Sequence, residues 1–133
     1  MAENHTLTPL RYWALKEYYP ILVKIKSPIT YGVLRQRVSP TAQRIVPQAM
    51  GAPLEFYRLY TVKRNLPDLS RIMISKAGHI GRNFNLAKNT MGTLEKDQEW
   101  CLGFEWPDDE MNVFFNQLED LIGKKREDIA RLF

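Results

Sequence analysis

The sequence is poor in the residues that build metal sites and disulfides. It contains one cysteine, Cys101, and two histidines among 133 residues. A single cysteine forms neither an internal disulfide nor a zinc site by itself, and such usage is typical of a reducing compartment. A glycine-rich phosphate loop and a Ser-His-Asp arrangement are also absent from the sequence. We therefore expect a protein that is not an enzyme and needs no cofactor and no metal.

Long hydrophobic runs are also lacking. The longest apolar run, around residues 18–25, is interrupted by Pro20 and Lys24. It is far shorter than the roughly 20 residues that a membrane-spanning helix needs. Residues 1–8 are polar and include Glu3, which is unlike a signal peptide. We expect a cytoplasmic protein with no membrane contact.

Acidic residues are scarce in the first two-thirds of the chain. Residues 1–92 contain fourteen Lys and Arg against four Asp and Glu, a net charge of +10, whereas residues 93–133 contain five against eleven, a net charge of −6. The overall charge of +4 conceals this division. Segregated charge of this kind indicates the kind of partner rather than the fold, and the basic part favours nucleic acid.

Helical periodicity is abundant in the basic part. The length predicts one domain over residues 1–133, with a basic part at 9–92 and an acidic helical extension at 93–133. Thr8-Pro9 is a helix-start signal, and Pro20 is expected to kink or divide that first helix. Ser39-Pro40 repeats the signal, and Pro47 is expected to shorten the helix that follows. The predicted elements are helices over residues 9–25, 33–38, 39–50 and 54–65 and a short strand at 29–32.

The period changes to two after Pro67. This alternation predicts a strand over residues 69–75, a turn at Ala77-Gly78 and a return strand over 79–84. Residues 94–104 fit either a helix or an extended segment. Further helices are predicted from Pro107 to a break at Gly123 and over 127–133. The order predicts an α+β fold, a winged helix-turn-helix core with an N-terminal helix and a C-terminal helical extension, in which helix 39–50 enters the major groove.

Residues suited to contacting DNA lie along this predicted core. Thr, Gln and Arg side chains on the helix at 39–48 can read base edges, and basic side chains beside it and at the hairpin tip can bind phosphates. The alternative is that these residues form an ordinary solvated helix face and a turn with no role in binding. The predicted DNA-binding residues are Arg35, Arg37, Thr41, Gln43, Arg44, Gln48, Lys76, His79 and Arg82.

Two further sets of residues have a structural interpretation. Aromatic residues at helical spacing in the first half, such as Trp13, Tyr18 and Tyr57, are expected in the core rather than stacked on bases. The acidic residues of segment 95–110 are expected on a solvated face, with a protein-contact surface or a metal site as alternatives. Cys101, between Trp100 and Leu102, is expected to be a buried, inert thiol.

Two resemblances follow from short motifs. The segment Ile29-Thr30-Tyr31-Gly32 and the elements predicted up to residue 84 resemble the DNA-binding domain of alkylguanine-DNA alkyltransferases and alkyltransferase-like proteins, which are winged helix-turn-helix proteins. Their PCHR motif is absent here, since Cys101 lies outside the matching segment, so the resemblance implies a fold and no alkyl transfer. The chain also resembles a family of small uncharacterised bacterial proteins, through residues 29–32, 66–69, 74–76, 78–84 and 104–106.

These observations favour a non-enzymatic protein that binds double-stranded DNA, as a small regulator or a mobile-element accessory protein. The alternative is a protein–protein interaction module, such as a phage-type inhibitor of a bacterial defence system, that uses the acidic C-terminal helices and the apolar helix at 111–122. A third class is a hydrolase that uses the carboxylates of residues 95–110. The net charge of −6 at residues 93–133 keeps the second class open, because a plain DNA-binding domain does not need it.

Overall fold

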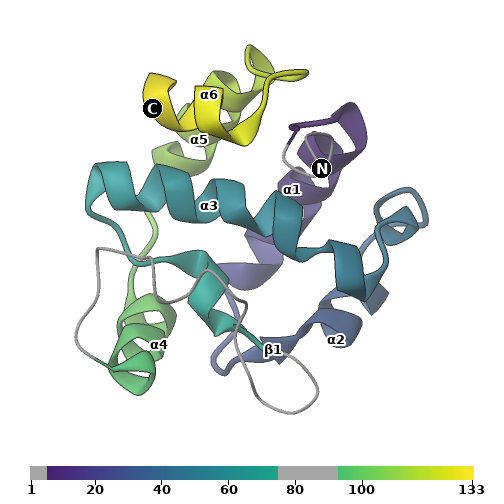
Figure 1. Cartoon of the computed structure of the whole chain (residues 1–133). Helices are drawn as coiled ribbons and strands as arrows, with labels where there is room; N and C mark the ends of the chain where they lie inside the picture. The colour runs from purple at the N-terminus through teal and green to yellow at the C-terminus, as the bar shows by residue number, and fades with distance from the viewer. Residues whose placement is uncertain (1–5, 75–92) are drawn as a thin grey trace.

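A computed structural model describes residues 6–74 and 93–133 as a mainly helical α+β protein with one two-stranded sheet (Figure 1). The α-helices are α1 (Pro9–Leu22), α2 (Tyr31–Gln36), α3 (Gly51–Arg64), α4 (Leu94–Gly103), α5 (Asp108–Glu119) and α6 (Arg126–Leu132). The strands are β1 (Ile29–Thr30) and β2 (Met73–Ile74), and three 3-10 helices are η2 (Ala42–Arg44), η3 (Pro47–Ala49) and η4 (Leu69–Ile72).

Helix α1 begins at the predicted signal. The Thr8 side chain accepts a hydrogen bond from the Arg11 backbone N–H at 3.2 Å, and Pro9 occupies the first helical position. Such a cap satisfies one of the donors that a helix start leaves open. Pro20 lies inside the helix and does not divide it.

The segment Ile29-Thr30-Tyr31-Gly32 folds as a strand that leads into a helix, as predicted. Ile29 and Thr30 pair in parallel with Met73 and Ile74. Thr30 then caps α2, because its side chain accepts from the Val33 N–H at 3.3 Å. The sheet therefore joins residues 29–30 to residues more than forty positions later in the chain.

The helix predicted over residues 39–50 is wrong. Two 3-10 turns, η2 and η3, take its place, and Ile45 and Val46 between them have extended backbones with ψ of 108° and 159°. The ring of Pro47 causes the break, because a residue that precedes proline is pushed out of the helical region. No α-helix is therefore available between Ser39 and Met50 to enter a groove.

The strand predicted over residues 69–75 is mostly wrong. Asp68 caps η4 by accepting a hydrogen bond from the Ser70 N–H at 2.9 Å, so the chain turns at Leu69–Ile72. Carboxylate caps of this kind compete with extended pairing. Of the described residues in this segment, Met73–Ile74 form a strand, and it pairs in parallel with β1. The predicted return strand at 79–84 lies outside the described residues.

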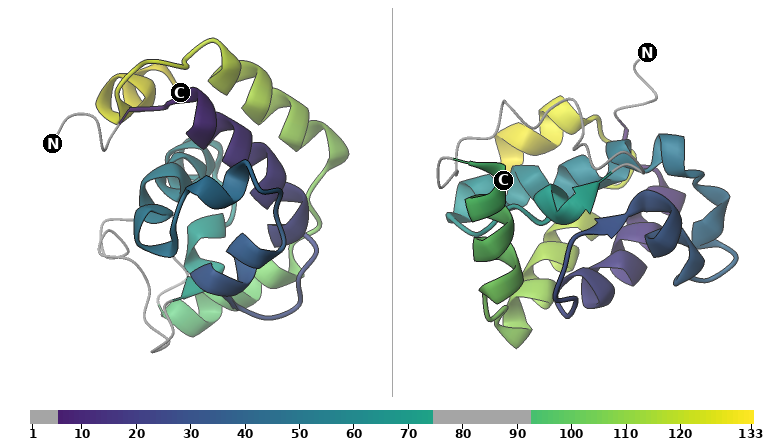
Figure 2. Two further views of the ribbon diagram at one scale, coloured as in Figure 1. Left: turned by 90° about the vertical axis from the view of Figure 1, so that its right-hand side faces the viewer. Right: turned by 90° about the horizontal axis from the view of Figure 1, so that it is seen from below.

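The core lies between α1, α3 and α5 (Figure 2). Tyr60 and Phe114 have ring centroids 4.6 Å apart, and the Tyr57 hydroxyl donates to the Leu15 carbonyl. The buried aromatic rings of α1 and α3 confirm the prediction of a core, with the exception of Trp13, which is half exposed. Phe114, Phe115 and the rest of the apolar face of α5 are covered by this same core.

The acidic part confirms the two predicted C-terminal helices and decides between the two alternatives for residues 94–104. Helix α4 covers Leu94–Gly103, and α5 and α6 follow on either side of Gly123, which has a φ of +96°. The Gly123 N–H donates to the Leu7 carbonyl at 2.7 Å, and the Leu7 N–H donates to the Lys124 carbonyl at 2.9 Å. The turn between α5 and α6 is thereby fastened to the segment that precedes α1.

Candidate nucleic-acid interface

A long stretch of the basic part of the chain contains no acidic residue. No Asp or Glu occurs between Glu17 and Glu55, while the same stretch carries five cations: Lys24, Lys26, Arg35, Arg37 and Arg44. Within residues 6–74 and 93–133, no ion pair includes any of the five. All except Arg35 are exposed. We call the four exposed cations, Lys24, Lys26, Arg37 and Arg44, the basic surface.

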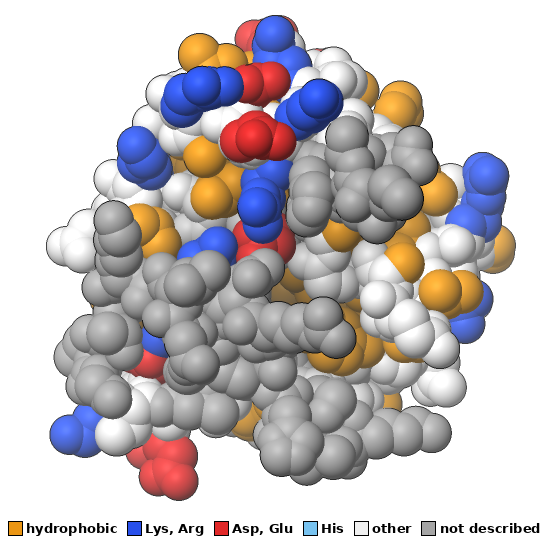
Figure 3. All heavy atoms as spheres, in the orientation of Figure 1, with side chains coloured by type: hydrophobic (Ala, Val, Ile, Leu, Met, Phe, Trp, Pro, Cys, Tyr) orange, Lys and Arg blue, Asp and Glu red, His pale blue; other side chains and the backbone are white. Residues whose placement is uncertain are grey.

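The arginines elsewhere in the described chain differ from these. Five of them form ion pairs with carboxylates, and Figure 3 shows basic and acidic side chains intermixed at the top of the view, over α5 and α6. At the right of the same view, over the segment between α2 and α3, Lys and Arg side chains have no acidic neighbour. The paired arginines are Arg58, Arg64, Arg71, Arg126 and Arg131.

Two of the predicted DNA-binding residues are engaged inside the protein. The Arg35 Nε donates to the Gln43 carbonyl at 2.8 Å, and the Gln43 amide donates to the Val38 carbonyl at 2.9 Å. These two bonds replace the helical hydrogen bonds that residues 39–50 do not make. This geometry favours a role for Gln43 in holding the η2 turn over the predicted role as a base reader.

The other four described candidates remain on the surface. Arg37 ends α2, and Thr41, Arg44 and Gln48 lie in or beside η2 and η3. Their side chains are exposed, as predicted. They are presented by a short, irregular segment rather than by one face of a helix. Lys76, His79 and Arg82 lie outside the described residues.

Glu17 forms the border between α1 and this segment. Its carboxylate accepts from the Ser39 N–H at 2.8 Å and from the Ser39 hydroxyl at 2.5 Å, and the Trp13 indole lies near enough to affect its pKa. Burial raises the pKa of Glu17, but the hydrogen bonds outweigh that effect and leave the pKa below its ordinary value. The Glu17 carboxylate is therefore charged at neutral pH and already hydrogen-bonded to Ser39.

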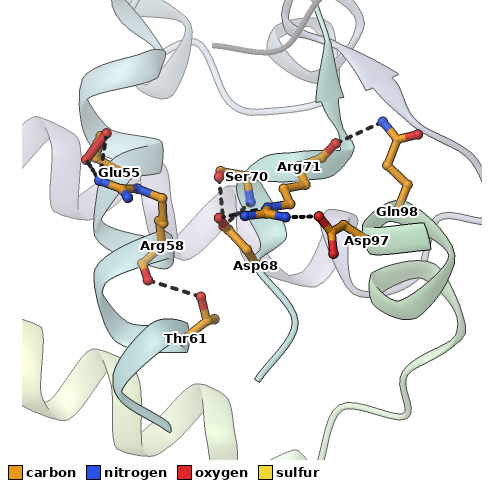
Figure 4. A network of polar contacts seen from close by, with 8 residues as sticks. All are labelled: Glu55, Arg58, Thr61, Asp68, Ser70, Arg71, Asp97 and Gln98. Carbon is orange, nitrogen blue, oxygen red and sulfur yellow. Dashed lines mark hydrogen bonds and ion pairs between the residues drawn. The ribbon is translucent and has the colours of Figure 1, made fainter. Parts of the chain in front are cut away.

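A buried ion-pair network joins η4 to α4 beside α3 (Figure 4), and the sequence analysis did not predict it. Arg71, 2 % exposed, pairs with Asp97 of α4, and its Nε lies 3.5 Å from the Asp68 carboxylate. Gln98 donates to the Arg71 carbonyl at 3.0 Å. The spacing of Asp68 and Arg71 was the available signal, because residues three apart in a helical turn can pair. Asp97 is thus buried, which corrects its predicted place on a solvated face.

The network shifts the ionisation of its own members. Burial raises the pKa of Asp68 and lowers that of Arg71, against the attraction between the two charges. Burial is the main effect that raises the pKa of the Cys101 thiol to about 12, and the charges of Asp68 and Arg71 act on it as well. At neutral pH the thiol is protonated and covered, which makes it a poor nucleophile. The prediction that Cys101 is buried is confirmed.

Two acids of residues 95–110, Asp97 and Glu110, form ion pairs. Asp97 is paired with Arg71, while Glu110 accepts from the Tyr60 hydroxyl at 2.6 Å and pairs with Arg64 at 3.2 Å. In the part of the chain that the structure describes, no three His, Cys, Asp or Glu side chains gather as metal ligands do.

None of the helices in the described residues is both long and apolar enough to span a bilayer.

Comparisons of this chain with protein-family models, with curated proteins and with solved structures found no match. Function is therefore inferred from the residues of the chain itself.

Proposed function

We propose that this protein binds double-stranded DNA without catalysis and that the basic surface contacts the phosphate backbone. One observation carries the proposal: the stretch from residue 18 to residue 54 holds five cations without an acid, and four of them are exposed and outside any ion pair described above. Unpaired cations release the counterions condensed on DNA when they meet phosphates, and this release supplies most non-specific affinity.

Base reading is assigned to the exposed polar side chains of the same segment. Arg44 can donate to guanine, and Thr41 and Gln48 can contact base edges or phosphates. Arg35 and Gln43 act through the backbone bonds that hold this segment. They are positioning residues.

The winged helix-turn-helix core within this α+β fold stays a prediction. In its favour, α2, the two 3-10 turns and α3 follow one another directly after β1. The wing would comprise Lys76, His79 and Arg82, which lie outside the described residues. The proposed role as a small regulator or mobile-element accessory protein depends on the same prediction, as do the resemblances to bacterial and alkyltransferase-like proteins.

Fluorescence anisotropy with a labelled duplex tests DNA binding. The parent protein is expected to bind at low salt and to lose affinity steeply between about 50 and 200 mM salt. The variant Arg37→Ala/Arg44→Ala is expected to weaken binding and to lower the slope of log K against log salt by about 2, roughly one for each cation removed. Lys124→Ala/Lys125→Ala is the matched control, since these exposed cations lie among the acids of the C-terminal part.

Two results would refute DNA binding by this surface. One is a parent protein that does not bind at low salt, and the other is equal loss in the double variant and in its control.

The protein–protein alternative has one observation for it and one against it. Exposed acids on α5 and just after it, such as Asp108, Asp109 and Asp120, are free to meet a basic partner. The apolar face of α5, however, is covered by the chain's own core and is not available for docking. A protein complex that forms equally well with Arg44→Ala would favour this alternative over DNA.

A further inference from the structure

Trp13 is the most exposed aromatic side chain of the described residues. It is 49 % exposed and lies on the solvent-facing side of α1, where Pro9 and Lys16, one turn before and after it, are exposed as well. Exposing half of an indole to water forgoes the burial that stabilises other aromatic residues. Trp13 is therefore a candidate for contact with something outside the chain.

The indole lies beside the Glu17 side chain. It is close enough to help lower the pKa of that carboxylate, which accepts hydrogen bonds from Ser39 at the start of the segment that carries Thr41 and Arg44. Helix α1 packs directly against η2, and the left view of Figure 2 shows the two side by side. Trp13 thus borders the proposed DNA-contacting segment.

The charges near this ring favour an anionic partner. Lys16 is exposed one turn further along α1, with its Nζ 5.6 Å from the centre of the Tyr12 ring. Arg44 is exposed on the adjoining η2 turn. Glu17, the acid beside Trp13, is already taken up by Ser39. An exposed aromatic face beside unpaired cations is the combination by which proteins bind single-stranded nucleic acids, with bases on the rings and phosphates on the cations.

We propose that Trp13 stacks on an unpaired nucleobase while the basic surface holds the adjoining phosphates, an inference that rests on the proposed function. In an intact duplex both faces of each internal base are covered by its neighbours, so only an unpaired base can reach the ring. The preferred substrate class is accordingly DNA in which a duplex adjoins unpaired nucleotides. A single exposed ring suits a base better than a protein, since a stable protein interface needs roughly 800 Å² from each partner.

The test compares two labelled DNAs of equal length and sequence, one a perfect duplex and one with a small bulge of unpaired thymines. The parent is expected to prefer the bulged DNA. Trp13→Ala is expected to lose about 5-fold or more of its affinity for the bulged DNA and to bind the perfect duplex as the parent does. Leu132→Ala, at an exposed apolar residue of α6, serves as the matched control. Thermal unfolding by circular dichroism verifies that each variant is folded.

Trp13→Phe separates stacking from a structural role. Phenylalanine keeps a ring for stacking but has no N–H, so it is expected to restore most of the preference for bulged DNA. Stacking also quenches indole emission, so bulged DNA is expected to quench the parent and to quench Trp13→Phe less, because only Trp100 and Trp106 remain.

Several outcomes would overturn the stacking role. These are equal binding of both DNAs by the parent, an equal loss on both DNAs in Trp13→Ala, no rescue by phenylalanine, and a self-association that Trp13→Ala abolishes. In each of these the parent still binds duplex DNA. A parent that binds neither DNA instead refutes the proposed function.

Discussion

At the scale of single residues, Glu17 shows how one carboxylate can fix a surface. Against the effect of burial, its hydrogen bonds from Ser39 hold the pKa below the ordinary value of 4.5 in the folded protein. A lowered pKa means that this contribution to stability is complete above pH 4.5 and is lost as the pH falls through the folded value. Glu17→Gln is therefore expected to be less stable than the parent at neutral pH, with a difference that shrinks below about pH 4.5.

Urea unfolding of both proteins across this pH range measures that difference. Glu105→Gln, at an exposed carboxylate, is the control. A Glu17→Gln deficit that stays constant down to pH 3 would contradict the role of the charge.

Gln43 and Gln48 separate positioning from contact. Gln43→Ala removes the bond to the Val38 carbonyl and is expected to lower the free energy of unfolding by about 1 kcal/mol, while the preference among DNA sequences stays as in the parent. Gln48→Ala, at an exposed side chain, is expected to change DNA binding and leave stability within about 0.5 kcal/mol of the parent. Chemical denaturation and competition binding measure the two effects. The opposite pattern would restore Gln43 as a base reader.

At the scale of elements, α4 is attached through buried charge. Arg71→Ala leaves Asp68 and Asp97 facing each other without their cation, and it is expected to cost about 3–5 kcal/mol of stability. Arg131→Ala breaks an ion pair on α6 whose arginine is 75 % exposed, and it is expected to cost less than about 1 kcal/mol. Denaturant titration followed at 222 nm compares the two variants. Equal costs would mean that α4 does not depend on the network.

The same scale shows what can be read from the sequence. Capping residues and 3.6-residue periodicity predicted α1, α3 and the C-terminal helices, because these signals act over a few neighbouring residues. The predictions of a helix over residues 39–50 and of a strand over 69–75 were wrong because single residues, Pro47 and Asp68, outweighed a pattern that depends on the whole segment. Exposure of Arg37 and Arg44 was predictable from charge. The engagement of Arg35 and Gln43 was not, because their partners are backbone carbonyls brought close only by the folded chain.

At the scale of the whole molecule, Gly123 links distant parts of the chain. Its φ of +96° strains any other residue, and its N–H bonds to Leu7. Gly123→Ala is expected to cost about 1–3 kcal/mol even though open space surrounds the added methyl group. Gly51→Ala, where the backbone is helical and the space is also open, is expected to be neutral or stabilising by up to about 1 kcal/mol. Thermal melts of both variants check the contrast, and equal melting temperatures would contradict it.

The pairing of β1 with β2 and of Leu7 with residues 123–124 also fixes an order of events during synthesis. A strand of two residues has no stability alone, so Ile29-Thr30 stays unpaired until Met73-Ile74 has left the ribosome. Leu7 waits still longer, because its backbone partners come after α5. Contacts between residues so far apart close slowly, since the intervening chain must first be ordered. The nascent protein therefore completes its core only after nearly all of its residues have emerged.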